Sequence, residues 1–402
     1  MKKIFLIALC LLVLAAIMVA CGQQQSQTIQ ISANVDLETP FIGFLPEQPE
    51  SINLDAYQRV SLEDIVSYTP RYAYGTRLYF DTISEQGQLP YLILQYALDH
   101  AQTSVYIDQR LLEGAEETID EILMFLALDN AMLEQNLSWG YQDISISMTG
   151  STGSTDVRGK ILQIDEFAQG KLDKKLEALK KAEEIIAQMP QGLTDEEIAQ
   201  WIYRYLGTHV EYFAAYGTGE KPDYLYDALC VGKTNCDGYA NAYSLLCSLA
   251  DIDCAEKMYT PEDPKEIGHT WNLVNLGDTW YNVDATGSHE VRGEYGIMSH
   301  FCVADDRMEY TYSYKDRLPA CDQNLIQPDC VITGSDDAAD AVKQAYDTIR
   351  NTDRNYILVL FAEGEQDSDT MRDIANTLGM SITTQYYITG SGDAVYYIFP
   401  EK

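Results

Sequence analysis

Residues 233–243 read KTNCDGYANAY, and this stretch is the most informative part of the sequence. It places Cys236 in a turn that contains asparagine and glycine, and the apolar residues 240–249 that follow are spaced like a buried helix. The pattern predicts that Cys236 stands at the N-terminus of that helix. There the unpaired backbone amides and the positive end of the helix dipole favour a thiolate over a thiol and offer donors to a developing oxyanion.

A second stretch, GHTWNLVNLGDTWYNVDAT at residues 268–286, has two aromatic and β-branched runs that flank Gly277-Asp278. Such a pair predicts a two-residue hairpin turn, in which paired residues have numbers that sum to 555 (277 + 278). Asp284 then lies opposite Trp271, and His269 shares the sheet face of Trp271 because side chains alternate along a strand. The register therefore brings the Asp284 carboxylate within reach of the His269 imidazole, whereas a three-residue turn would put them on opposite faces.

Cysteine, histidine and aspartate in this arrangement predict nucleophilic catalysis. Cys236 would attack a carbonyl carbon, His269 would move the proton, and Asp284 would fix the imidazole tautomer and stabilise its cation. Each residue alone has a plainer explanation, and Cys247 and Cys254 are interpreted as small buried core residues. The hypothesis depends on three blocks that occur in order with compatible geometry.

These blocks resemble the signature of the transglutaminase-like superfamily: a cysteine followed by glycine and an aromatic residue, a His-x-Trp and an Asp-x-Thr. They stand here as Cys236-x-Gly238-Tyr239, His269-x-Trp271 and Asp284-x-Thr286. The resemblance covers about residues 195–310, and the spacings of 33 (269 − 236) and 15 (284 − 269) residues fit it. It implies an α+β, papain-like core in which the cysteine helix packs against a sheet that bears the histidine and the aspartate. It also implies that these three residues form the catalytic triad.

The sequence does not identify the side chain that would stabilise the oxyanion. Papain-like enzymes often have a polar or aromatic residue upstream of the cysteine, and Cys230 stands six positions (236 − 230) before Cys236. The backbone N–H of Cys236 is one candidate donor, and weaker candidates for oxyanion or substrate contacts are Tyr212, Gly238 and Trp271. Gly238 would also let the backbone turn tightly beside the sulfur.

Two regions flank the predicted core, which spans residues 191–315. The first, residues 51–190, is predicted to be an N-terminal α+β region because it has helical periodicity and strand-like alternation; the expected helices are 89–102, 113–128 and 172–189, and the expected strands are 143–148 and 160–164. The second, residues 316–402, is predicted to be a small α/β unit with helices 338–350 and 368–378 and strands 356–362, 382–388 and 394–399. The core itself begins with a helix after Thr194, whose acidic first turn suits a helix N-terminus.

The N-terminus reads as an export signal. Two lysines precede an apolar run over residues 4–20, and Met18-Val19-Ala20-Cys21-Gly22 resembles the lipobox of bacterial lipoproteins, in which the cysteine is lipid-modified. We expect residues 1–20 to be a signal peptide, Cys21 to carry a lipid anchor to the cell membrane, and residues 21–50 to be a flexible tether. An uncleaved membrane anchor and an ordinary signal peptide are the alternatives. The predicted location is extracytoplasmic.

The formal net charge of −35 strongly disfavours nucleic acid as a partner. No cofactor is expected, and no metal site, because the chain has no C-x-x-C pair and its five histidines do not cluster with cysteines. An odd number of cysteines remains after Cys10 and Cys21, so at least one thiol should be free. If Cys236 is that thiol, pairing among the other cysteines stays open, with Cys321–Cys330 as one plausible short loop; the others are Cys230, Cys247, Cys254 and Cys302.

The predicted activity is acyl transfer through a cysteine thioester. Transamidation, deamidation and peptide hydrolysis need the same nucleophile and base, so the sequence does not choose among them. Location alone points to proteins or cell-wall peptides at the cell surface as substrates, and the oligomeric state is not predicted. The alternative from another class is a non-catalytic surface module in which a transglutaminase-like core serves binding or assembly.

Overall fold

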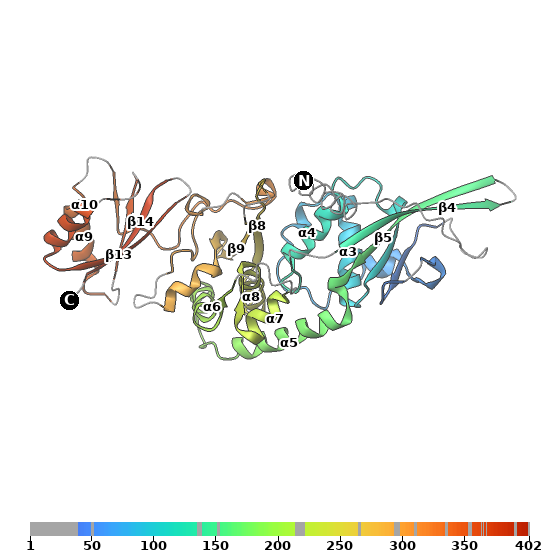
Figure 1. Ribbon diagram of the computed structural model, residues 1–402, viewed down its shortest axis with the longest axis horizontal. Helices are drawn as coiled ribbons and strands as arrows, with labels where there is room; N and C mark the ends of the chain where they lie inside the picture. Colours follow the sequence, from blue (N-terminus) through green and yellow to red (C-terminus); the bar gives the residue numbers. More distant parts are fainter. Residues whose placement is uncertain are drawn as a thin grey trace, which may run out of the picture. The chain divides into compact units, whose positions relative to one another are not determined.

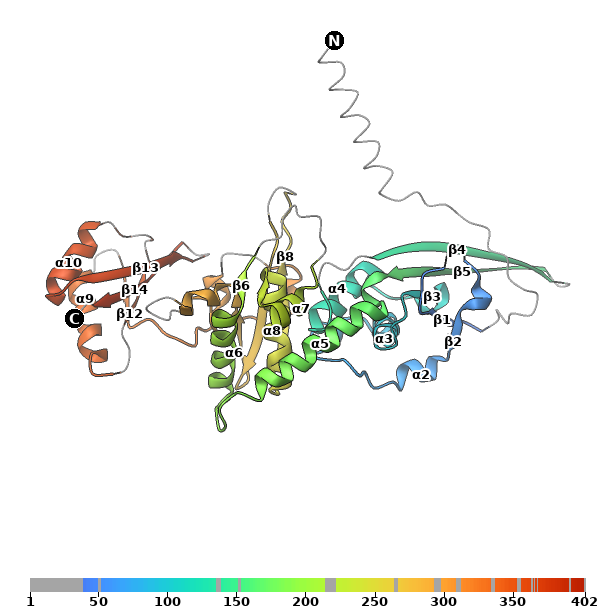
Figure 2. The same cartoon turned by 60° about the horizontal axis from the view of Figure 1, so that its bottom comes forward.

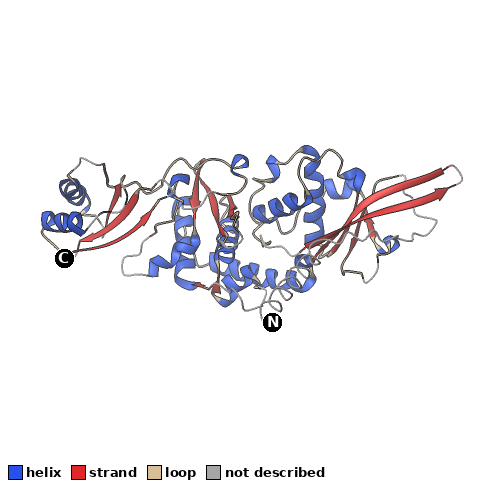
Figure 3. Cartoon of the chain, turned by 45° about the horizontal axis from the view of Figure 1, so that its top comes forward, coloured by secondary structure: helices blue, strands red, loops and turns tan. Residues whose placement is uncertain are grey.

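The computed structural model combines helices and sheets, as Figure 3 shows, and confirms the predicted α+β class. Its helices are α2 Leu62–Val66, α3 Glu85–Asp99, α4 Ile119–Asp129, α5 Gln169–Ile186, α6 Asp195–His209, α7 Tyr224–Tyr226, α8 Cys236–Leu249, α9 Ala338–Ile349 and α10 Ser368–Leu378. The structure describes residues 39–49, 52–134, 139–150, 153–213, 222–263, 267–292, 298–308, 312–333, 337–352, 356–362, 364, 366, 368–389 and 392–400.

The chain forms two compact units. The first comprises Met1–Arg71, Ile83–Leu123 and Asn136–Leu172, and the second comprises Tyr72–Thr82, Met124–Gln135 and Asp173–Lys402. Two short segments from early in the chain therefore belong to the same unit as the cysteine helix.

The first unit is built on a five-stranded sheet of order β2-β1-β3-β5-β4. Its strands are β1 Ile42–Leu45, β2 Gln58–Val60, β3 Ser104–Asp108, β4 Trp139–Gly150 and β5 Gly153–Ile164. β4 and β5 form the long hairpin seen in Figure 1, and both strands extend beyond the ranges expected from the sequence. Tyr106 and Ile161 contribute to the core on one side of this sheet.

One strand of this sheet corrects an expectation. Residues 21–50 were predicted to be a flexible tether, yet Ile42–Leu45 form β1, which pairs with β2 and β3 and is largely buried. The signal was present in the sequence, because Phe41, Ile42, Phe44 and Leu45 lie between two prolines. The predicted signal peptide and Cys21 lie outside the described residues.

The central sheet of the second unit has the order β10-β9-β8. Its strands are β8 Cys254–Tyr259, β9 His269–Leu276 and β10 Thr279–Val283. Helix α8 packs on this sheet, where the Asn272 side chain of β9 donates to the Ala240 carbonyl of α8 at 3.0 Å; Figures 1 and 2 both place α8 beside β8 and β9. This is the predicted packing of the cysteine helix on the sheet of the histidine.

Helix α6 begins where the sequence predicted. Thr194 accepts a hydrogen bond from the Glu197 backbone N–H, and the Glu197 side chain accepts one from the Thr194 N–H, which completes a capping box. The buried face of α6 includes Ile202, Tyr203 and Leu206, and it belongs to the same hydrophobic core as α8.

The C-terminal residues form a four-stranded sheet of order β11-β12-β14-β13. The strands are β11 Cys330–Ile332, β12 Ile357–Phe361, β13 Ile382–Ile388 and β14 Ala394–Pro400. The last three match the predicted strands to within a few residues, and β11 was not predicted. Alternate residues of β12 face a core shared with α9 and α10.

A further two-stranded sheet lies before the cysteine helix and is formed by β6 Glu211–Tyr212 and β7 Lys233–Thr234. Among the described residues, no helix is long and apolar enough to cross a membrane.

Candidate active site

Cys236 is the first residue of the 14-residue helix α8, as predicted. Asn235 is the N-cap residue, and its side-chain oxygen accepts a hydrogen bond from the Gly238 backbone N–H at 3.4 Å. The Cys236 side chain is nearly buried, with 5% of its residue surface exposed. The sulfur is therefore held against the unpaired amides of a helix N-terminus, which stabilise negative charge.

Gly238 has a different role from the one expected. It lies inside α8 rather than at a tight turn, and a Cβ atom there would stand 2.0 Å from the Thr234 Oγ1 atom and 2.7 Å from the Tyr224 carbonyl oxygen. The glycine is needed because the preceding segment packs directly on the first turn of α8, not because the backbone is strained.

The hairpin of β9 and β10 has the predicted register. Thr279 pairs with Leu276 and Val283 with Asn272, so paired residue numbers sum to 555. The two turn residues have left-handed backbone angles, with φ of 59° at Gly277 and 67° at Asp278, which is the geometry of a type I′ turn. The position of Asp284 relative to His269 follows from this register.

His269 and Asp284 form the contact that the register predicted. The His269 Nε2 atom lies 2.7 Å from the Asp284 Oδ2 atom. The other carboxylate oxygen accepts the backbone N–H of Thr286 at 2.9 Å, which forms a local turn after the aspartate. The Asp284 backbone N–H donates to the His300 carbonyl at 2.9 Å. Thr286 thus holds one carboxylate oxygen and His300 holds the backbone of Asp284, while the second carboxylate oxygen meets the imidazole.

The pair is ionised at neutral pH. Burial lowers the pKa of His269, but the charge and hydrogen bond of Asp284, with a further contribution from Cys236, outweigh it and raise that pKa to about 10. Burial pushes the pKa of Asp284 upward, yet His269 and then His300 hold it below its usual value. His269 also makes a side-chain hydrogen bond with Cys236. Since Asp284 takes Nε2, the Nδ1 atom is left for the sulfur, and the imidazolium faces that sulfur.

A buried carboxylate next to the cysteine was not foreseen. The Asp237 Oδ1 atom accepts a hydrogen bond from the Thr270 hydroxyl at 2.7 Å, and its Oδ2 atom accepts from the Asn235 side chain at 3.2 Å. Thr270 directly follows His269, so this bond ties the start of α8 to the start of β9. The only signal in the sequence was the position of Asp237 beside Cys236.

The weaker candidates have separate outcomes. Tyr212 is aligned with Thr234 through the parallel pairing of β6 and β7, and its ring stacks on Tyr239 at 6.5 Å, so it lies close to the cysteine segment and is 42% exposed. Trp271 is fully buried, and its indole N–H donates to the Asn282 side chain at 3.1 Å. Trp271 is therefore not available to an oxyanion or a substrate, and that interpretation was wrong.

All seven cysteines from Cys230 onward are free thiols, including Cys321 and Cys330, whose pairing the sequence left open. Cys247 and Cys254 are fully buried core residues, as interpreted from the sequence. Within the described ranges, no group of three or more His, Cys, Asp or Glu side chains is placed to hold a metal ion.

A family model and two known proteins match part of this chain. Residues 182–285 match the model of the transglutaminase-like superfamily. The kyphoscoliosis peptidase of Homo sapiens is 33% identical over 113 residues, and that of Mus musculus is 31% identical over 110 residues. In both cases the match covers 24% of this chain and 16% of the relative, so the chain spans about a sixth of the length of these relatives.

Two solved structures are also similar. The crystal structure of a TGase has a TM-score of 0.23 at 10% identity, covering 49% of this chain and 54% of that one. The periplasmic domain of TgpA from Pseudomonas aeruginosa has a TM-score of 0.23 at 11% identity, covering 46% of this chain and 69% of that one. Residues 182–285 are thus similar to the transglutaminase-like superfamily, and Cys236, His269 and Asp284 all lie within this matched range.

Proposed function

We propose that the chain is a cysteine acyl-transfer enzyme that acts outside the cytoplasm on proteins or cell-wall peptides. The observation that carries the proposal is the contact of Cys236, at the N-terminus of α8, with an imidazole that Asp284 holds at 2.7 Å. The superfamily of the matched domain typically performs cysteine acyl transfer or proteolysis. A nucleophile, its base and the residue that orients the base are thus all supplied by one domain.

In the first half-reaction the Cys236 thiolate attacks the carbonyl carbon of a glutamine carboxamide or a peptide bond, and the carbonyl electrons move to oxygen. The N-terminal amides of α8 stabilise that oxyanion. When the tetrahedral species collapses, the C–N bond breaks and the His269 imidazolium gives its proton to the leaving nitrogen. Ammonia or an amine departs, and a thioester remains on Cys236.

In the second half-reaction His269 is neutral and acts as a base. It takes a proton from an amine or a water molecule that attacks the thioester, the C–S bond breaks, and the thiolate and imidazolium are restored. Placement of the second substrate decides between transamidation and hydrolysis, because the protein groups are the same in both.

Selective alkylation tests the nucleophile. Cys230 and Cys330 are more exposed than Cys236, and burial raises the pKa of both thiols, that of Cys330 to about 12. They are therefore internal controls for accessibility. We expect iodoacetamide at pH 6 to modify Cys236 first despite its burial, because the thiolate is the reactive form. Mass mapping of the modified peptides measures this order, and His269→Ala should abolish the preference for Cys236.

If Cys236 is inert while Cys230 reacts, the enzyme proposal fails and a non-catalytic binding module takes its place. If Cys236 reacts equally well in His269→Ala, the cysteine is a nucleophile without the proposed base. Assays with an amine probe and a glutamine-containing protein then separate transamidation from release of ammonia.

The proposed location has its own test. In the bacterial host that the lipobox implies, the full chain should fractionate with membranes and incorporate labelled palmitate. Cys21→Ser should remove both the label and the membrane association and release the protein from the cell surface. Retention of Cys21→Ser in the membrane fraction without label would instead support an uncleaved anchor formed by the apolar run at residues 4–20.

A further inference from the structure

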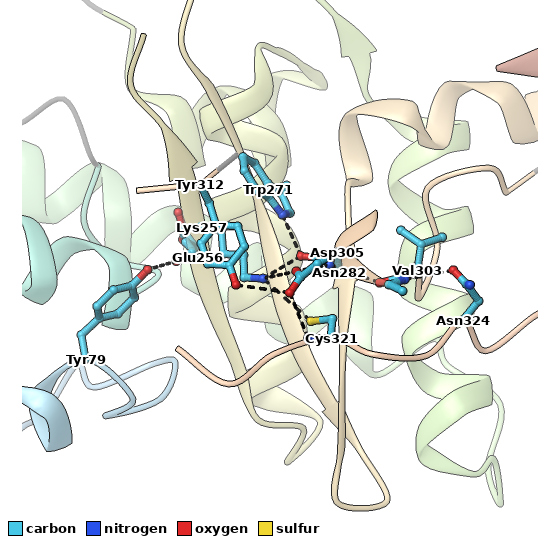
Figure 4. Close-up of polar contacts among 11 residues, drawn as sticks. Tyr79, Glu256, Lys257, Trp271, Asn282, Val303, Asp305, Tyr312, Cys321 and Asn324 are labelled. Atoms are coloured by element: carbon cyan, nitrogen blue, oxygen red, sulfur yellow. Dashed lines mark hydrogen bonds and ion pairs between the residues drawn. The ribbon is translucent and has the colours of Figure 1, made fainter. Parts of the chain in front are cut away.

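A buried polar network connects Lys257 of β8, Trp271 of β9 and Asn282 of β10 (Figure 4). Lys257 of β8 is fully buried, and its ammonium donates to the Asn282 Oδ1 atom at 2.8 Å, the Asp305 Oδ1 atom at 3.1 Å and the Cys321 sulfur at 3.8 Å. The Tyr312 ring lies 3.7 Å from the ammonium, measured to the ring centroid. The three donors of the lysine are all engaged, so this is a fixed cation and not a mobile one.

Asn282 is the centre of this network. Its side-chain oxygen accepts from Lys257 and, at 3.1 Å, from the Trp271 indole. Its side-chain amide donates to the Val303 carbonyl at 3.2 Å and to the Asp305 carboxylate at 2.9 Å. Asn282 is fully buried, and both acceptor sites and both donors are used. A network satisfied in this way allows a single arrangement of the side chains that form it.

The network reaches the catalytic pair from two strands. Trp271 follows His269 by two residues on β9, and its ring is nearly parallel to the imidazole, with an interplanar angle of 20° and centroids 5.9 Å apart. Asn282 precedes Asp284 by two residues, at the end of β10. Because side chains alternate along strands, these residues share one sheet face. One amide therefore links the strand that carries the histidine to the strand that leads to the aspartate.

Stability alone does not account for a buried lysine at this position. Burying an ammonium and a carboxylate costs several kcal/mol per ion, and a well-packed apolar cluster of similar volume is often as stable. Burial lowers the pKa of Lys257, while Cys321 and Asp305 oppose that change, and the charge of Lys257 holds the pKa of Asp305 down despite burial. What the ion pair adds is a fixed orientation for the Asn282 amide.

We propose that Asn282 and Lys257 are positioning residues that hold Trp271 and the end of β10, and through them the His269–Asp284 pair, in the geometry that acyl transfer requires. The role in acyl transfer rests on the proposed function. The effect of Asn282 and Lys257 on the His269–Asp284 pair does not rest on that function, because it concerns the ionisation of His269 in the protein without substrate.

The experiment measures the ionisation of His269 by NMR of the full chain with labelled histidine, assigned through His269→Gln. The groups that face His269 are Asp284 and Cys236, and His300 faces Asp284 in turn. In Asn282→Leu the side-chain bonds to Trp271, Val303 and Asp305 are lost, while the backbone pairing of β10 remains. We expect the His269 midpoint to fall by at least about one pH unit, and Cys236 alkylation at pH 6 to slow about tenfold.

Two further variants separate positioning from stability. Val274→Ala removes buried volume from β9 in the core that contains α8, and should lower the melting temperature without moving the His269 midpoint. Trp271→Phe removes only the indole N–H that the Asn282 oxygen accepts, and it keeps an aromatic ring in the buried site and the bonds of Asn282 to Lys257, Val303 and Asp305. This variant should lower the His269 midpoint, because it cuts the hydrogen bond between Asn282 and the strand that carries His269.

An unchanged His269 midpoint in folded Asn282→Leu, or an equal shift in Val274→Ala, overturns the positioning role. If Asn282→Leu does not fold, Trp271→Phe decides: an unchanged His269 midpoint contradicts the proposal, and a lowered midpoint supports it. Failure of the proposed function gives a different result from failure of the positioning role. Cys236 would then be unreactive toward iodoacetamide in the wild type, while the His269 midpoint could still be measured.

Discussion

Asp284→Asn will slow thioester formation by about a thousandfold to ten-thousandfold while the protein stays folded. An asparagine keeps the shape of the side chain and still accepts the Thr286 N–H, which Asp284 accepts at 2.9 Å. It cannot stabilise an imidazolium, and its amide group would face the His269 Nε2 atom. Burial is then opposed only by the smaller contribution of Cys236, so the pKa of His269 falls from about 10. The imidazole can no longer protonate the leaving nitrogen at neutral pH.

Pre-steady-state kinetics with an activated ester or a glutamine peptide measure this rate across pH. Wild-type acyl transfer should decline only as the pH approaches 10, where His269 loses its proton, and this alkaline limb should move to lower pH in the variant. Asp278→Asn is the matched control, because it removes the same charge from the turn of the same hairpin, where asparagine tolerates the φ of 67°. A variant at Asp284 that keeps more than about a tenth of the wild-type rate would show that the carboxylate is not part of the mechanism.

The same pair should make stability depend on pH in two directions. The pKa of His269 is raised above 6.5, so its stabilisation is complete below that pH and is lost as the pH rises through about 10. The pKa of Asp284 is lowered below 3.8, so its stabilisation is present above that pH and is lost as the pH falls through the folded value. Both contributions should be missing from the pH profile of unfolding in Asp284→Asn.

The site was predictable because it is encoded locally. A cysteine before a buried helix, and a Gly-Asp turn between two strands, are short-range patterns whose geometry is set by the backbone. The two-residue turn fixed the register, and the register alone brought Asp284 to His269. The helix start at Thr194 was predictable for the same reason, since a capping box lies within four residues.

The features that the sequence did not predict depend on contacts between residues far apart in the chain. Asn282 looks like any strand residue until the segment that contains Val303 and Asp305 is placed beside β10, and Lys257 gives no sign in the sequence that it is buried. The role of Gly238 was misjudged because the close contact comes from Thr234 and Tyr224, not from its own backbone angles. The strand at Ile42–Leu45 was missed because only its partners β2 and β3 show that it belongs to a sheet.

Glu256→Gln will stabilise the protein at pH 7 by up to about 3 kcal/mol, the free energy of taking up a proton at 2.5 pH units above the ordinary pKa of 4.5. Glu256 of β8 is fully buried, and its side chain accepts from the Asn241 amide at 2.9 Å, while its backbone carbonyl accepts from the Tyr79 hydroxyl at 3.1 Å (Figure 4). Among the described residues the Oε2 atom has no hydrogen-bond partner. Burial raises the pKa of Glu256 well above its usual value, Cys254 and Asp237 add to this, and the Asn241 bond opposes it.

The sign of the effect follows from these causes. The unfolded chain loses the Glu256 proton near pH 4.5, whereas the folded protein keeps it, so stability is highest below that pH and falls as the pH rises toward the folded pKa. Glutamine is neutral at every pH and removes this pH dependence of the free energy of unfolding.

Denaturant unfolding at pH 5, 6, 7 and 8 measures the difference in the free energy of unfolding between wild type and variant, which should grow with pH. Glu184→Gln, at a side chain that is 54% exposed, should leave the profile unchanged. A difference that is constant with pH would mean that Glu256 is ionised in the folded protein, held by partners stronger than the single amide of Asn241.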